Sequence, residues 1–198
     1  MSDFFEPPPR PPSPEPERHR PPPWFGPPRG TLAGSLPLDL VLARTVRAAV
    51  CVTRVAAYPT GFEFEVVTLA ADEFDPDLDP VFFDPPTGWR SGAGEVPPQK
   101  LRIGVQFADG AKATNLGVHL SEDSPPRGPV LCPRGGGGGG GSWQQTLWVW
   151  PLPPAGPLTL ACEWPAVGIP LTRRELDAQT ILEAASRAQV VFADPGAG

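Results

Sequence analysis

The sequence predicts a mainly β protein: an antiparallel β-sandwich, immunoglobulin-like or jelly-roll-like, of about seven or eight strands with a C-terminal α-helix. Three observations support this prediction. Several short segments alternate apolar and polar side chains with the period of two that is typical of half-buried strands. Turn-forming residues, rather than helices, separate most of these segments, which argues against a parallel sheet. One apolar pattern with i, i+3, i+4 spacing stands near the C-terminus.

Three regions differ in composition. Residues 1–30 are predicted to be a disordered proline-rich arm, because proline favours extended polyproline II and builds no packed core. The PxxP matches at Pro8–Pro11 and Pro11–Pro14 are typical of ligands for aromatic grooves, although a solvated spacer is the simpler interpretation. Trp24 and Phe25 interrupt the prolines and would anchor the arm to the domain or contact a partner. Residues 31–192 are predicted to form a single β-sandwich domain, and 193–198 a loose tail.

The first strands are expected within residues 36–55. The segments LPLDLVLAR and VRAAVCVTRV both alternate, and they form either a hairpin or one long bent strand. A turn at Tyr58–Gly61 then precedes FEFEVVTLA, in which Phe62 and Phe64 face inward and Glu63 faces outward. We therefore predict a hairpin that joins residues 49–56 to residues 62–69.

Residues 72–94 form a long acidic segment that is predicted to be an exposed loop. Its DxDxD spacing resembles the start of a calcium loop, so three carboxylates are weak metal-ligand candidates: Asp75, Asp77 and Asp79. A calcium hand needs glycine at position 6 and glutamate at position 12, where this chain has Pro80 and Pro86. We therefore predict no metal and no cofactor.

The next hairpin is expected in residues 100–118, with Asp109-Gly110 as its turn. Residues 121–141 are predicted to be loop, apart from a short strand candidate at 129–132. The glycine run Gly135–Gly141 is interpreted as a flexible linker within this loop. A phosphate-binding loop would need a lysine and a following helix, and the sequence has neither here.

Residues 143–164 contain four of the six tryptophans and are predicted to be two strands joined by a proline-stiffened turn. Trp148 and Trp150 share one face of the first strand, while Leu147 and Val149 share the other. Three side chains would form an aromatic platform for sugars or proline-rich peptides: Trp143, Trp148 and Trp150. Packing in the core is the favoured interpretation, because one buried indole removes roughly 150–250 Å² from water.

The C-terminal helix is predicted over about residues 172–191. Thr172 and Glu175 match the capping box that begins many helices. The apolar stripe of this helix comprises Ala178, Ile181, Leu182, Ala185, Ala188 and Phe192. We expect the stripe to pack on its own domain, with a partner protein as the alternative.

Charge and cysteine content restrict the classes of function. The chain has 198 residues and a net charge of −6, which argues against nucleic acid or anionic lipid as a partner. No apolar run is long enough to span a membrane, and no signal peptide is evident, so we expect a cytoplasmic protein without membrane contact. The cysteines are three and sparse, which does not suggest a disulfide framework or a zinc site. Buried free thiols are expected, with a Cys51–Cys162 bridge as the alternative.

Catalytic signatures are not found in the sequence. His19 lies in the arm, where no scaffold orients it. His119 precedes Ser121 and Glu122 on a strand-like segment, but successive side chains on a strand point apart and form no triad. No catalytic residue is therefore predicted, and we expect a protein that is not an enzyme.

Several segments together resemble a family of uncharacterised bacterial proteins with a proline-rich arm and a tryptophan-rich β hairpin. They are WFGPPRG, AYPTGFEFEV, LRIGVQFADG, the glycine run, WVWPLPPAGPLTLACEWPAVGIP and the terminal helix. The resemblance covers most of residues 24–192 and implies no catalytic residue. The leading hypothesis is a non-enzymatic protein-interaction or scaffold module, whose partner binds the arm or the C-terminal helix. The alternatives are a ligand- or carbohydrate-binding β-sandwich and an uncharacterised hydrolase.

Overall fold

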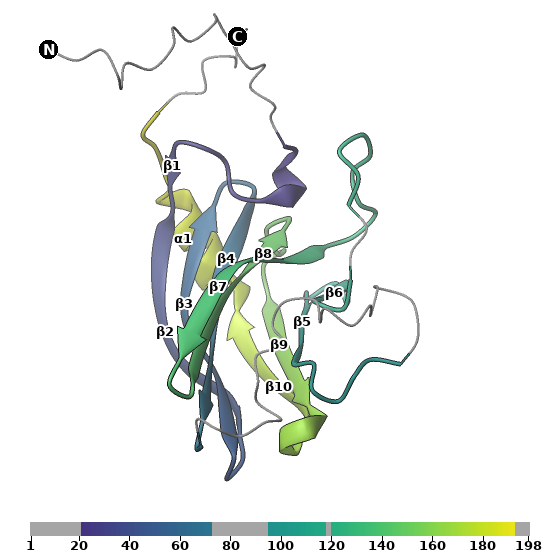
Figure 1. Ribbon diagram of the computed structural model, residues 1–198. Helices are drawn as coiled ribbons and strands as arrows, with labels where there is room; N and C mark the ends of the chain where they lie inside the picture. Colours follow the sequence, from purple (N-terminus) through teal and green to yellow (C-terminus); the bar gives the residue numbers. More distant parts are fainter. Residues whose placement is uncertain (1–20, 73–94, 118–119, 193–198) are drawn as a thin grey trace, which may run out of the picture.

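The protein is a mainly β structure in which two antiparallel sheets face each other (Figure 1). The computed structural model describes residues 21–72, 95–117 and 120–192. The larger sheet has five strands in the order β2-β3-β4-β8-β7. These strands are β2 (Gly34–Arg44), β3 (Ala48–Tyr58), β4 (Gly61–Ala70), β8 (Ser142–Trp150) and β7 (Val130–Gly139). The predicted antiparallel β-sandwich is confirmed.

The smaller sheet has four strands in the order β10-β9-β5-β6. They are β10 (Ile169–Asp177), β9 (Pro157–Trp164), β5 (Arg102–Gln106) and β6 (Lys112–Thr114). A two-stranded ribbon, β1 (Thr31–Leu32) with β11 (Gln189–Val190), brings the two ends of the described chain together. The remaining elements are the helix α1 (Ala178–Ser186) and two 3-10 turns, η2 (Pro23–Phe25) and η4 (Pro165–Val167).

The core lies between the two sheets and is closed by α1. Phe62, Phe64 and Val66 of β4 are buried, as are Leu158, Leu160 and Cys162 of β9. All of them belong to one cluster that also includes Ile181 and Ala184 of the helix. The predicted inward face of β4 is therefore confirmed. Burial of one such aliphatic or phenyl side chain contributes about 1.5–3 kcal/mol, so the cluster dominates the stability of the sandwich.

The predicted hairpins of the first half are present. β2 and β3 are separate antiparallel strands, which decides between a hairpin and one long bent strand. β3 and β4 pair with Ala49 opposite Leu69 and Ala56 opposite Glu63, within the predicted ranges. β5 and β6 form the third hairpin around Asp109-Gly110, although β6 ends at Thr114 and is shorter than predicted.

The tryptophan-rich segment is not a hairpin. β8 pairs with β4 and β7 in the five-stranded sheet, whereas β9 pairs with β5 and β10 in the four-stranded sheet. The proline-rich connection at residues 151–156 therefore carries the chain from one layer to the other. The prediction of two strands was right and the prediction of their pairing was wrong, because alternation defines a strand but not its partner.

The glycine run was predicted to be a flexible linker, and this prediction was wrong. Residues 130–139 form β7, which pairs with β8 up to Gly139 opposite Ser142. Gly140 and Gly141 make the turn with φ of 58° and 75°, the left-handed values that glycine adopts without strain. A Cβ at Gly136 or Gly138 would lie within 2.6 Å of a backbone oxygen of β8, so two glycines of the run allow close strand approach.

The helix begins later than predicted. Residues 172–177 belong to β10, with Thr172 opposite Cys162 and Glu175 opposite Thr159, so the expected capping box lies on a strand. The helix starts after Asp177, whose Oδ1 accepts a hydrogen bond from the Gln179 amide at 2.9 Å. Pairing with β9 outweighs the local helix signal because it satisfies a whole strand of backbone groups. The helix ends at Ser186, and Phe192 is 74% exposed rather than part of the buried stripe.

The cysteines are free thiols, so the alternative of a Cys51–Cys162 bridge is not realised. Cys51 lies on β3 and is half-buried, whereas Cys162 lies on β9 in the core. Burial raises the pKa of Cys162 to about 11, which keeps this thiol protonated near neutral pH.

The folded part begins before residue 31, because residues 23–25 form η2 and contact the sandwich. Residues 1–20, 193–198, His119 and the metal-ligand candidates Asp75, Asp77 and Asp79 lie outside the described residues. Within the described ranges, no helix is long and apolar enough to cross a membrane.

The position of the helix start leads to a first prediction. Asp177→Ala removes the N-cap acceptor and should lower the free energy of unfolding by about 1 kcal/mol. Thr172→Ala, a matched change on β10, should change it by no more than about 0.5 kcal/mol. Urea unfolding of both variants measures the difference, and a larger loss for Thr172→Ala would place the helix start at the capping box instead.

Candidate functional site: the aromatic anchor of the N-terminal arm

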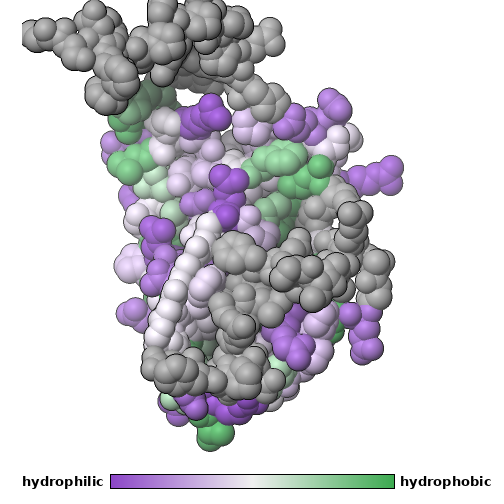
Figure 2. All heavy atoms as spheres, viewed as in Figure 1, coloured by the Kyte–Doolittle hydropathy of each residue, from purple (hydrophilic) through white to green (hydrophobic). Residues whose placement is uncertain are grey.

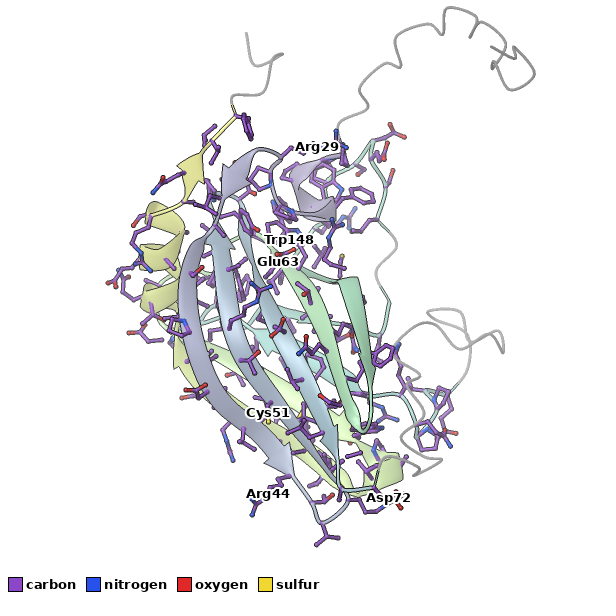
Figure 3. The ribbon with its side chains drawn as sticks, turned by 60° about the vertical axis from the view of Figure 1, so that its left-hand side comes forward. Arg29, Arg44, Cys51, Glu63, Asp72 and Trp148 are labelled. Atoms are coloured by element: carbon purple, nitrogen blue, oxygen red, sulfur yellow. The ribbon has the colours of Figure 1, made fainter. Side chains whose placement is uncertain are left out.

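The outer face of β8 carries indole rings that the core cannot cover. Leu147 and Val149 point into the core, so Trp148 and Trp150 point away from it. Trp148 nevertheless has no exposed surface. Figure 3 places Trp148 and Glu63 together at the end of the sheet where the described chain begins. An element outside the two sheets must therefore cover this ring.

The ring is covered by residues 23–26 of the N-terminal arm, which we name the arm root. The Trp148 indole donates a hydrogen bond from Nε1 to the Pro23 carbonyl oxygen at 3.2 Å. The ring of Trp24 meets the ring of Trp150 edge-to-face, with centroids 5.7 Å apart and planes at 65°. Trp24 Nε1 donates to the Ser121 carbonyl oxygen at 2.9 Å. The arm root is therefore held by β8 of the sandwich and by the loop that contains Ser121.

Arg134 of β7 holds the end of the arm root. Its Nη1 donates to the Phe25 carbonyl oxygen at 2.9 Å. A Cβ at Gly26 would lie 2.9 Å from the guanidinium carbon of Arg134, so glycine leaves room for this contact. The polar contacts of Trp148 and Arg134 both go to main-chain oxygens of the arm. They therefore recognise the shape and backbone of a proline–aromatic segment rather than polar side chains.

β3 and β4 complete the site beneath Trp148. The rings of Tyr58 and Trp148 meet edge-to-face, with centroids 5.8 Å apart. A Cβ at Gly61 would lie 2.7 Å from the Trp148 ring, so this turn position needs glycine for the close approach. We name the group Tyr58, Glu63, Arg134, Trp148 and Trp150 the anchor site.

Glu63 gives the anchor site a half-buried carboxyl group. It lies on β4 opposite Trp148, and the Tyr58 hydroxyl donates to its Oε2 at 3.5 Å. Burial raises the pKa of Glu63, and the positive charges of Arg134 and Arg54 oppose the shift. Burial also raises the pKa of Tyr58, with a further contribution from the charge of Glu63.

The structure brings together four of the five predicted contact residues. Trp24, Phe25, Trp148 and Trp150 meet at the anchor site, whereas Trp143 packs against the core and lies opposite Thr68. Trp148 has no accessible surface, so an external ligand cannot touch it in this state. Among the described residues, no group of three or more histidine, cysteine or acidic side chains could hold a metal ion.

Sequence reasoning missed the contributions of Tyr58, Glu63 and Arg134. The outward direction of Glu63 followed from alternation, but its partners depend on the pairing of β4 with β8. Arg134 stands directly before the glycine run, which was interpreted as loop and therefore had no expected position. No protein-family model, curated protein or solved structure matches this chain.

The indole hydrogen bond leads to a second prediction. Trp148→Phe removes the donor to Pro23 and part of the ring, so the free energy of unfolding should fall by about 1–3 kcal/mol. Amide hydrogen exchange at Trp24–Gly26 should become faster. Trp143→Phe is the matched control and should leave exchange at these residues unchanged. Equal exchange in the two variants would contradict the role of Trp148 as an anchor.

The buried carboxyl group leads to a third prediction. Because the folded pKa of Glu63 lies above its ordinary value of 4.5, the folded state holds the proton more tightly than the unfolded state. The free energy of unfolding therefore falls as pH rises through the window between these two pKa values. Glu63→Gln removes this loss, so the stability of the variant relative to the wild type should increase from about pH 4 to about pH 8. Thermal melts of both proteins at both pH values measure this relative stability. A stability difference that does not change with pH would show that burial does not raise the pKa of Glu63.

Proposed function

We propose that the chain is a non-enzymatic protein-interaction module that presents its proline-rich arm from a fixed point on a β-sandwich. The observation that carries the proposal is the anchoring of the arm root by Trp148 and Arg134 through the carbonyl oxygens of Pro23 and Phe25. An arm that served only as a spacer would not need aromatic and polar contacts at its root. Residues 1–20, which contain the PxxP motifs, precede this anchored segment.

The proposed partner is a protein with an aromatic groove that binds polyproline II segments. Proline-rich peptides lose little conformational entropy on binding, because they are already extended. A fixed root limits how far from the sandwich a partner bound to residues 1–20 can lie. The C-terminal helix is a weaker candidate for the partner contact, since Ala178, Ile181 and Ala184 are fully buried in its own domain. We also propose a cytoplasmic location, which the three free thiols support.

The fourth prediction tests this function with purified groove domains. The full chain should bind at least one member of a panel of SH3, WW and EVH1 domains in calorimetric titrations. A quadruple variant with alanine at Pro8, Pro9, Pro11 and Pro14 should lose this binding, because it leaves no PxxP spacing in residues 1–20.

The matched control is Glu17→Ala, a change in the same arm that leaves every PxxP motif intact and should keep full affinity. The quadruple variant should also unfold at the same temperature as the wild type. Absence of binding to every panel domain, or equal affinity of the quadruple variant, would reject the arm as the binding element.

A further inference from the structure

Each of the two sheets ends in strands whose outer backbone groups are not paired within the sheet. These terminal strands are β2 and β7 in the larger sheet, and β10 and β6 in the smaller one. An edge strand presents free N–H and C=O groups along one side and can pair with another chain. Natural proteins prevent this with proline, charged side chains, β-bulges or very short edge strands.

Three of the four edges carry such protection. β2 contains Pro37 and Asp39, and its register shifts twice along the pairing with β3. β10 contains Pro170, the charged pair Arg173 and Arg174, and a register shift. β6 has three residues and begins with a lysine. These edges are therefore unsuited to pairing with another strand.

These protective features are missing from residues 135–139, which we call the glycine half of β7. Pro133 and a register shift protect only its first half, before Gly136. Residues 133–140 are all exposed, and no charged residue occurs between Gly135 and Trp150. No described strand is hydrogen-bonded to the outer edge of β7. Figure 2 shows the glycine run as a narrow pale band along the strand without projecting side chains. Its backbone is therefore accessible from the edge.

Packing within the sheet explains only part of the glycine content. Gly136 and Gly138 are needed because a Cβ at either position would collide with the backbone of β8. A Cβ at Gly135, Gly137 or Gly139 would meet nothing within 4 Å, and none of these residues has a positive φ. Side chains are therefore tolerated at these three positions in the monomer, and their absence keeps the edge bare.

We propose that the open edge of β7, residues 135–139, pairs antiparallel with β7 of a second copy and joins the two five-stranded sheets into one continuous sheet. Antiparallel pairing of a strand with itself has two-fold symmetry, so each copy supplies the surface that the other needs. The chain carries a net charge of −6, but residues 135–139 have no charged side chains that would repel a second copy at this edge. The inference goes beyond the proposed function, because it does not involve the arm.

The fifth prediction is the oligomeric state of the full chain. Sedimentation over a concentration series should show a species of twice the 21.0 kDa chain mass. Gly137→Lys places like charges near each other across the proposed pair and should raise the dimer dissociation constant by about tenfold or more. The matched control is Gly128→Lys, which adds the same charge at an exposed glycine where a Cβ also meets nothing. This control should dimerise like the wild type.

A second readout locates the interface. Amide hydrogen exchange at residues 135–139 should slow as the concentration of the wild type rises, and should not change for Gly137→Lys. Circular dichroism should show that both lysine variants are folded. A wild type that stays monomeric, a dimer that survives Gly137→Lys, or protection confined to other residues would each overturn the proposal.

Discussion

The burial of alternate side chains between two sheets is the constraint on which the rest of the structure depends. Each strand that sends residues into the common core must send the alternate residues to the outside. On β8 the outward residues include Trp148 and Trp150. The core cannot cover these rings, so the root of the arm does. The anchor site is thus a consequence of the way β8 contributes Leu147 and Val149 to the core.

The β7–β8 pair connects the two functional features that we infer. At one end of the pair, Trp148 and Arg134 hold the carbonyl oxygens of the arm root. At the other end, the glycine half of β7 runs to the turn at Gly140, with its outer edge bare. A partner on the arm and a second copy on the edge would therefore occupy different parts of one sheet. The two proposals are independent, because neither set of contacts is required by the other.

Tertiary pairing overrides local preference at two places. A run of glycines has a low propensity for both helix and strand. β7 nevertheless forms, because its backbone pairs with that of β8, and at Gly136 and Gly138 the two strands lie too close together for a residue with a Cβ. The Thr172–Glu175 motif favours a helix start, yet the edge of β9 recruits these residues into β10. In both cases the gain comes from satisfying the backbone of a neighbouring strand, which local sequence does not encode.

Alternation and turn chemistry in the sequence by themselves determined the β class, the inward face of β4, and the hairpin of β3 with β4. These features depend on contacts between near neighbours along the chain. Trp24, Phe25, Trp148 and Trp150 were likewise visible as candidate contact residues. Only the tertiary structure decided that β8 and β9 belong to different sheets, that Arg134 lies on a strand, and that Glu63 and Tyr58 meet Trp148. Those contacts join residues far apart in the chain, and the period of a strand identifies its buried face without identifying its partner.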